Sequence, residues 1–346
     1  MRWPRPTRHC RSRTQTGGAL FGLTRALEAE AAIRRAVELG ERQLGVAATR
    51  LRGLLADSHD AQSRTSEAFA AYTDSDWLQR EVNAAQCATA SPSALQYALG
   101  LVDYLRSADR TRWCAAPPSS GPESPAGDVF VLGFLRSGTA LLEVTLEGHA
   151  QVASVEESES LIDSMHQFMQ QPQDLERLVH APPTTLDTLR GAYWRRVAQT
   201  GVDGSGKVLV DKSPLNILKL SLIARLFPRA NTLVTCRDSR DVVRSGFRHR
   251  FRMRRPIYEM LTLAGAAHYY DAVMRVLMEC TCLLPPGYSL VRHEGVVSGF
   301  AREMCRVCDL LGLKWDPPMG EFAGRTHGRT DARPRCADSL HRPARP

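Results

Sequence analysis

Residues 128–146 read DVFVLGFLRSGTALLEVTL, where an apolar run typical of a buried strand leads through a short polar turn into a helical pattern. The first N–H groups of a helix and the positive end of its dipole favour an anion. Gly138 lets the backbone approach a ligand closely, and Arg136 offers a forked donor. Ser137 and Thr139 add hydroxyl groups. The stretch therefore predicts an α/β fold with a phosphate-binding turn at the end of its first strand.

Short β-rich runs alternate with helical patterns in the chain that follows. The expected strands are 129–134, 208–210, 232–236 and 288–291, and a helical pattern follows each one. This alternation is typical of βαβ units, which build a mainly parallel sheet with helices on both faces. The sequence therefore predicts an α/β fold of the P-loop type, whose ligands bind at the carboxyl ends of the strands.

The chain before this sheet has a helical pattern. Residues 25–57 hold two helical stretches joined near Gly40, and residues 91–107 fit a further helix. This N-terminal all-α part resembles a tetratricopeptide array, although no clean repeat of about 34 residues can be placed on it. The expected domains are a basic disordered arm (1–24), a helical domain (25–114), a Pro-, Ser- and Gly-rich linker (115–128), the α/β domain (129–322) and an Arg- and Pro-rich disordered tail (323–346).

The composition is that of a globular protein, because 43% of the 346 residues are apolar and can fill a core. The net charge is +8, but the two arginine-rich ends supply more than this excess, so the rest of the chain is slightly acidic. Basic tails bind polyanions weakly and without sequence preference, so no specific nucleic-acid function is expected. No apolar run approaches the length of about 18 residues that a membrane span needs, and no secretory signal is evident, so the expected location is cytoplasmic.

Nine cysteines, an odd number without a regular framework, are expected to be reduced thiols. A C-x-x-C motif at 305–308 is a candidate half of a zinc site, but its partner at 280–282 lacks the usual two-residue gap. Met304, Cys308 and Leu311 fall at helical spacing, which indicates core packing instead. No metal site is expected.

The turn after the first strand fits the ATP-binding template G-x-x-x-x-G-K-S/T only in part. Gly133 and Gly138 match its glycines, but Thr139 stands in the place of the lysine and Ala140 in that of the magnesium-binding hydroxyl. A magnesium-ATP enzyme, such as a P-loop kinase without its lysine, is therefore disfavoured. The simplest alternative is an ordinary glycine-containing turn between a strand and a helix, and a later segment argues against it.

Residues 231–251 again run from a strand through a charged turn into a helix. Arg237 at the end of that strand can fork onto a second phosphate, and Ser245 can add a hydroxyl from the helix. Three further arginines repeat every four residues and are expected to form a solvated helix face: Arg240, Arg244 and Arg248. Two phosphate sites without a magnesium ligand indicate a nucleotide that carries phosphates at separate positions.

Five stretches, in order, resemble the sulfotransferases that use 3′-phosphoadenosine-5′-phosphosulfate (PAPS), of the bacterial tetratricopeptide-linked and tyrosylprotein type. GFLRSGTALL (133–142) resembles the family's 5′-phosphosulfate loop, G-F-P-R-S-G-T-T-L-L. The others are GHAQVASVEESE (148–159), VLVDKSPLNILKLSLIARLFPRA (208–230), CRDSRDVVRS (236–245), and YSLVRHEGVV with LLGLKWDP (288–317). They are similar to the family segments H-P-x-V…G-E-E, D-K-x-P-x-N, R-D-P-R-D-V…S and R-Y-E-D-L…L-G-L-x-W-D-P. The resemblance covers about residues 129–322.

This resemblance implies an enzyme that moves a sulfuryl group in line from PAPS to an acceptor hydroxyl, with no metal. It implies that Glu157 is the catalytic base, with the adjacent Glu156 as the alternative, and that Lys212 stabilises charge on the transferred group. The resemblance implies that the 5′-phosphosulfate binds to Arg136, Ser137, Gly138, Thr139 and Ala140. It implies that the 3′-phosphate binds to Arg237 and Ser245. The acceptor is unidentified, and the helical domain is a candidate for presenting a protein or peptide acceptor.

The sequence departs from the family at several positions. Ala140 replaces a second threonine, so one hydroxyl-to-phosphate bond is absent, at a cost of about 1.5–3 kcal/mol or roughly 10- to 100-fold in PAPS affinity. Leu135 and Ser239 replace prolines, and His293 and Gly295 replace Tyr and Asp of the closing block. Family members also continue beyond that block with a segment that helps close the site. Two interpretations stay open: a weakened sulfotransferase, and a catalytically inactive or truncated binding or scaffold protein.

Overall fold

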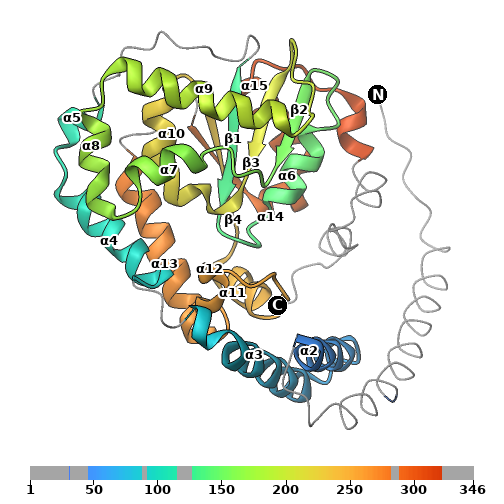
Figure 1. The fold of residues 1–346 in the computed structure, drawn as a ribbon. Coiled ribbons are helices and arrows are strands. Elements are labelled where there is room, and N and C mark those ends of the chain that lie inside the picture. The colour runs from blue at the N-terminus through green and yellow to red at the C-terminus, as the bar shows by residue number, and fades with distance from the viewer. Residues whose placement is uncertain (1–30, 32–45, 88–91, 115–126, 282–287, 322–346) are drawn as a thin grey trace. The chain divides into compact units, whose positions relative to one another are not determined.

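A computed structural model describes residues 31, 46–87, 92–114, 127–281 and 288–321 (Figure 1). The chain divides into two compact units, of which the first holds 1–93 with 247–267 and the second holds 94–246 with 268–346. The basic arm, the joint near Gly40, most of the linker and the C-terminal tail lie outside the described residues, so the predictions made for them stay predictions.

The second unit is built on a five-stranded parallel sheet. Its strands are β1 (Asp128–Gly133), β2 (Val152–Glu156), β3 (Val208–Lys212), β4 (Asn231–Cys236) and β5 (Tyr288–Arg292). The strand order is β2-β3-β1-β4-β5, and every neighbouring pair is parallel. The predicted α/β class with a mainly parallel sheet is confirmed. One strand was not expected from the sequence: β2 is short and rich in small residues, so its pattern is weak.

The helices of the second unit are α4 (Ala94–Ser107), α5 (Arg110–Cys114), α6 (Thr139–Leu146), α7 (Ile162–Phe168), α8 (Leu175–Val179), α9 (Pro183–Gln199), α10 (Leu220–Leu226), α14 (His293–Ser298) and α15 (Phe300–Leu310), with 3-10 turns η1 (Pro172–Asp174), η2 (Pro214–Lys219) and η4 (Pro317–Glu321). Helix α11 (Ser239–Phe247) lies in the second unit except for its last residue. Helix α13 (Leu263–Cys280) begins in the segment 247–267, which belongs to the first unit, and continues in the second unit. In the described residues, no helix combines the length and apolarity that a membrane crossing demands.

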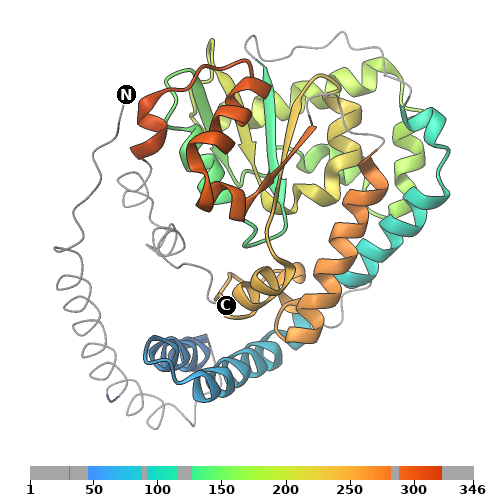
Figure 2. The ribbon, with the colours of Figure 1, turned by 180° about the vertical axis from the view of Figure 1, so that it is seen from behind.

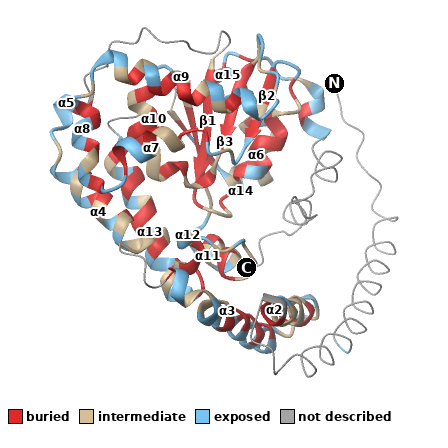
Figure 3. Ribbon diagram, in the orientation of Figure 1, coloured by how far each residue is buried: buried red, intermediate tan, exposed pale blue. Residues whose placement is uncertain are grey.

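Helices cover both faces of the sheet (Figures 1 and 2). On one face, valines of β1 and β3 join a core cluster with apolar residues of α6, α14 and α15. On the other face, the ring of Phe130 lies 6.0 Å from that of Tyr193 in α9 and 5.4 Å from that of Phe227, which follows α10. Alternate residues of a strand point to opposite faces, so an inner strand that is covered on both faces is buried along its length and mostly apolar. Every residue of β1 and β3 is accordingly buried (Figure 3).

The predicted helix at 91–107 is present as α4, but α4 and α5 belong to the unit with the sheet and not to the helical hairpin. Hydrogen bonds explain this grouping. Tyr97 donates its hydroxyl to the carbonyl of Met169 at 2.8 Å, and Arg110 pairs with Glu279 of α13 at 2.6 Å. The boundary expected at the 115–128 linker therefore does not separate these two helices from the sheet.

The first unit contains a helical hairpin, α2 (Val46–Ala61) and α3 (Thr65–Cys87), together with α12 (Arg255–Glu259). The hairpin also packs against the segment that begins at Phe247. The ring centroids of Phe247 and Tyr72 lie 6.4 Å apart. Arg248 pairs with Asp60, and Arg250 pairs with Asp57 at 2.5 Å. The expectation that Arg248 lies on a solvated helix face is wrong, because α11 ends before it and its guanidinium is held by the hairpin.

Candidate active site

The turn between β1 and α6 has the backbone that an anion site needs. Gly138 is the N-cap of α6 with a φ of 107°, a left-handed conformation that glycine adopts without strain, and it has no side chain with which to cap the helix. The first N–H groups of α6 are therefore left for a ligand. Arg136 also has a positive φ, 71°, which is costly for an arginine and turns the chain sharply before the helix.

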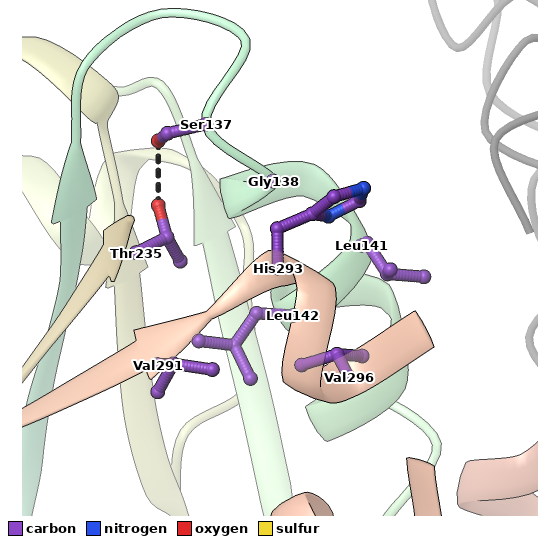
Figure 4. A pocket seen from close by; sticks show the side chains of 8 residues that line it. All are labelled: Ser137, Gly138, Leu141, Leu142, Thr235, Val291, His293 and Val296. Carbon is purple, nitrogen blue, oxygen red and sulfur yellow. Dashed lines mark hydrogen bonds between the residues drawn. The ribbon is translucent and has the colours of Figure 1, made fainter. Parts of the chain in front are cut away.

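A row of hydroxyl groups ties this turn to the neighbouring strand β4 (Figure 4). Ser137 donates to the carbonyl of Phe134 at 2.6 Å, and its Oγ lies 2.7 Å from Oγ1 of Thr235. Oγ1 of Thr235 also lies 3.3 Å from the carbonyl oxygen of Leu132. A methyl group on Gly133 would lie 2.5 Å from Oγ1 of Thr235 and 2.6 Å from Oγ of Ser137, so only glycine fits there.

Ser137 is thus 2% exposed, and its hydroxyl holds the turn in shape. Thr139 is buried as well, at 5% exposure, whereas Ala140 is exposed as the second residue of α6. The hydroxyls of Ser137 and Thr139, which the sequence predicts to bind a phosphate, are therefore buried, and that of Ser137 is hydrogen-bonded within the protein. Their predicted role as phosphate ligands stays a prediction, and the backbone of 137–140 is the part best placed for it.

The structure brings two predicted phosphate ligands together across 109 residues of sequence. Arg136 donates from Nε to Oγ of Ser245 in α11 at a distance of 3.1 Å. Arg237 lies at the end of β4, 20% exposed, and pairs with Asp241 at 3.5 Å. The start of α11 is fixed by Glu294, whose carboxylate accepts the N–H of Asp238 at 2.8 Å. This contact gives the one acid retained in the closing block a structural role.

The remaining arginines of α11 behave as the sequence predicts. Arg240 is 90% exposed and pairs with Asp238, and Arg244 is 65% exposed and pairs with Asp241. They form a solvated face of the helix.

His293, which stands where the family has tyrosine, packs against the turn (Figure 4). A methyl group on Gly138 would lie 2.9 Å from Nδ1 of His293, so the ring and the left-handed glycine fit closely together. Burial lowers the pKa of His293, and the nearby Arg237 acts in the same direction. Together with Ser137, Thr235, Val291 and others, His293 lines a small pocket behind the turn.

The predicted catalytic residues meet at the carboxyl ends of β2 and β3. The parallel register places Glu156 opposite Lys212. Nζ of Lys212 lies 3.1 Å from Oε1 of Glu156 and 3.0 Å from Oε1 of Glu157. Lys212 is the last residue of β3 and is only 2% exposed, while the carboxylates of Glu156 and Glu157 are 45% and 62% exposed.

A left-handed residue explains how two consecutive glutamates reach one amine. In a regular strand, neighbouring side chains point to opposite faces. Glu157 has a φ of 45°, and its N–H donates to the carbonyl of Lys212 at 2.8 Å. The alternation is broken at this point, so both carboxylates turn to the same ammonium group.

Sequence reasoning missed a third carboxylate of this cluster. Oε2 of Glu143, in α6, lies 3.4 Å from Nζ of Lys212, and Oε1 accepts the hydroxyl of Ser154 at 2.7 Å. Glu143 is fully buried. The available signal was a single acid in the helix TALLEVTL, where every other residue is apolar or threonine.

Among the described residues, no group of three or more His, Cys, Asp or Glu side chains is arranged to hold a metal. The predicted core packing of Met304, Cys308 and Leu311 is confirmed, since all three are buried. Cys308 lies 3.8 Å from the sulfur of Met319 within that core.

The turn after β1 and the cluster of charged residues around Lys212 lie at the ends of adjacent strands. β3 neighbours β1, and Lys212 pairs with Val131, two residues before Gly133. The carboxyl end of the sheet therefore carries a turn that opens a helix without a side-chain cap and, beside it, a buried cation with exposed carboxylates. Such an arrangement can hold a phosphate ester, take a proton from a hydroxyl group and stabilise negative charge between them.

Comparison with known proteins gives concordant results. A family model described as the sulfotransferase family matches residues 128–317. Protein-tyrosine sulfotransferase A of Caenorhabditis elegans is 22% identical over 194 residues, which cover 54% of this chain and 50% of that protein. The chain thus spans about half the length of this curated relative.

Two solved structures are also similar. The sulfotransferase domain of the Synechococcus PCC 7002 olefin synthase has 18% identity and a TM-score of 0.42, over 66% of this chain and 91% of that one. A sulfotransferase from Alicyclobacillus acidocaldarius has 17% identity and a TM-score of 0.38, over 65% and 98% of the two chains.

We expect Gly133→Ala to destabilise the protein by about 1–3 kcal/mol, because its methyl group would displace the hydroxyl row between Ser137 and Thr235. Thermal melting followed by circular dichroism measures the change. Gly191→Ala in α9 is the matched control, since its methyl group would make only an ordinary 3.6 Å contact with Arg195. The control is expected to gain about 0.5–1 kcal/mol. A Gly133→Ala protein that melts at the wild-type temperature would contradict the account of the turn.

Proposed function

Because the chain belongs to the sulfotransferase family, we propose that it transfers a sulfuryl group from PAPS to the hydroxyl group of an acceptor. The observation that carries this proposal is the contact of Lys212 with Glu156 and Glu157 beside the anion-binding turn. These are the charged groups that the reaction needs, on adjacent strands and at the same edge of the sheet.

The residues around the turn fit the donor. The backbone of 137–140 and the start of α6 would hold the 5′-phosphosulfate, together with Arg136. Arg237 and Ser245 would hold the 3′-phosphate, and the Arg136–Ser245 hydrogen bond links the two sets. When bound, PAPS supplies a sulfuryl group on a phosphate leaving group, so charge neutralisation by side chains suffices and no metal is assigned a role.

Glu157 acts as the general base in this proposal. Its carboxylate takes the proton of the acceptor hydroxyl while the acceptor oxygen bonds to sulfur and the sulfur–oxygen bond to the phosphate breaks. The electron pair of that bond passes to the 5′-phosphate of the product, PAP. Lys212 donates a hydrogen bond to the oxygen on which this charge develops. Glu157 is the better candidate of the two glutamates because its side chain is more exposed, at 62% against 45%, and so more open to an acceptor.

A protein or peptide is the acceptor class that we propose. The relative from Caenorhabditis elegans is named for protein tyrosine, and the present chain is similar to half of it. The helical hairpin of the first unit is the candidate surface for presenting such an acceptor.

A nucleotide-binding or scaffold protein without turnover is the alternative, and the observation that favours it is the exposed Ala140. Its position on α6 faces outward, where the family's threonine would add a hydroxyl for the donor. The interpretations differ in ligand binding and in turnover, which can be measured separately.

Titration calorimetry with PAP and with magnesium-ATP tests the donor site. We expect PAP to bind and magnesium-ATP not to bind, since the turn lacks the lysine and hydroxyl of an ATP site. Binding of magnesium-ATP in preference to PAP would turn the assignment toward a kinase. Failure of both nucleotides to bind would leave the scaffold interpretation.

Ala140→Thr is expected to tighten PAP binding roughly 10- to 100-fold, because it restores a hydroxyl to the second position of α6. Ala301→Thr is a matched control, since Ala301 is likewise the exposed second residue of a helix, α15. Calorimetry of both variants measures the difference. Equal PAP affinities in the two variants would show that the position of Ala140 does not contact the nucleotide.

Glu157→Gln is expected to retain PAP binding and to lose turnover by about 10²- to 10⁴-fold, because the amide cannot accept the proton. Transfer of labelled sulfate from PAPS to a set of tyrosine peptides measures turnover. Glu159→Gln, an exposed glutamate two residues along, is the control. If Glu156→Gln loses turnover and Glu157→Gln does not, Glu156 is the base.

A further inference from the structure

Glu143 is a buried acid that neither the proposed donor site nor the proposed base uses directly. We infer that Glu143 is a positioning residue that holds the ammonium group of Lys212 charged and directed at the reacting groups. This inference rests on the proposed function for its role in turnover. The effect of Glu143 on the charge of Lys212 does not depend on the proposed function and can be measured without any ligand.

The contacts of Glu143 fix it in place. Its side chain is fully buried, and its two oxygens have separate partners: Oε1 accepts from Ser154 of β2 at 2.7 Å, and Oε2 lies 3.4 Å from Nζ of Lys212. The same residue therefore contacts β2 and β3 from a helix on one face of the sheet. The hydrogen bond from Ser154 orients the carboxylate, and its second oxygen contacts the ammonium group as an ion pair.

The three carboxylates around Lys212 differ in how freely they can leave. Lys212 donates hydrogen bonds to Glu156 and Glu157, while Glu143 contacts the ammonium group as an ion pair at 3.4 Å. Glu156 and Glu157 are about half exposed, whereas Glu143 is not exposed at all. When Glu157 turns to an acceptor hydroxyl, Glu143 remains as the counter-ion of the buried amine. The N–H group of Lys212 that had donated to Glu157 then becomes available for the transferred group.

Two opposing effects, burial and the neighbouring carboxylates, determine the charge state of Lys212. Burial lowers the pKa of Lys212, and the carboxylates, led by Glu143, raise it above the ordinary value of lysine. The charged groups that face Lys212 come from α6 and from the end of β2: Glu143, Glu156 and Glu157. Asp211 precedes Lys212 in the strand and lies on the opposite face of the sheet. Burial raises the pKa of Asp211 to about 7, and this carboxyl accepts the hydroxyl of Tyr193 at 3.1 Å. Glu143 is thus the one fully buried carboxylate in contact with Nζ.

Glu143 also connects Lys212 with the donor turn. It lies four residues after Thr139 on α6, so the two residues occupy the same face of the helix, one turn apart. The helix whose start would bind the 5′-phosphosulfate therefore carries the counter-ion of the lysine. A shift of that helix would move both.

A direct measurement of the Lys212 amine tests the inference. The chain has only four lysines, so protein labelled with ¹³Cε-lysine should give four side-chain signals. Loss of one signal in Lys212→Arg assigns it. In the nucleotide-free protein, we expect the Lys212 signal of Glu143→Gln to lose its proton at a lower pH than in the wild type, because one neighbouring negative charge is gone and burial remains.

Glu147→Gln, a glutamate next to the end of the same helix, is the matched control and should leave the Lys212 titration unchanged. Melting curves verify that each variant is folded. If Glu143→Gln does not fold, Ser154→Ala removes the hydroxyl that orients the carboxylate, and it should shift the Lys212 titration in the same direction by a smaller amount. A Lys212 titration that is the same in wild type and in the folded variants overturns the inference.

The rate of sulfuryl transfer separates this inference from the proposed function. In Glu143→Gln the alkaline limb of kcat should move to lower pH, with kcat falling about tenfold per pH unit above the lowered pKa, while PAP affinity stays unchanged. A uniform loss of kcat at every pH would indicate a merely structural role and would overturn the inference. Absence of sulfuryl transfer in the wild type, with a shifted Lys212 titration in the variant, would overturn the proposed function alone.

Discussion

A positive charge buried at the end of an inner strand requires negative charge around it, and this requirement organises one edge of the sheet. Lys212 is 2% exposed, so its ammonium group cannot rely on water. The register of β2 supplies Glu156, a left-handed residue brings in Glu157, and α6 supplies Glu143. Three elements that are separate in the sequence are thus held together by one cation.

The turn between β1 and α6 depends on a different constraint, which is close packing between β1 and β4. Gly133 leaves just enough room for the hydroxyls of Ser137 and Thr235, and the hydrogen bond between them ties the turn before α6 to β4. Since α6 also carries Glu143, the turn and the lysine share one eight-residue helix. The start of α6, where we propose that the donor binds, and the carboxylate that contacts Lys212 therefore belong to the same helix.

The sequence predicts the sheet well where an inner strand has a mostly apolar or β-branched run, as in β1 and β4, because an inner parallel strand leaves a strong pattern. It predicts β2 poorly, since an edge strand of small residues resembles a loop. Motif order brings out Arg136, Glu157 and Lys212, which lie near strand ends. It misses Glu143, because the contact between that residue and Lys212 depends on how α6 packs on the sheet. Arg248 was misplaced for the same reason: its partner, Asp60, is distant in sequence.

The ion pairs of Arg248 and Arg250 with the hairpin bear on how this protein can be divided. An expression fragment that begins at β1 would appear complete, because it contains every strand of the sheet and every candidate site residue. It would also remove Asp57 and Asp60, leaving two partly buried guanidinium groups without their carboxylates a few residues after Ser245. An expression fragment should therefore include the hairpin, because its carboxylates compensate the charge of these two guanidinium groups.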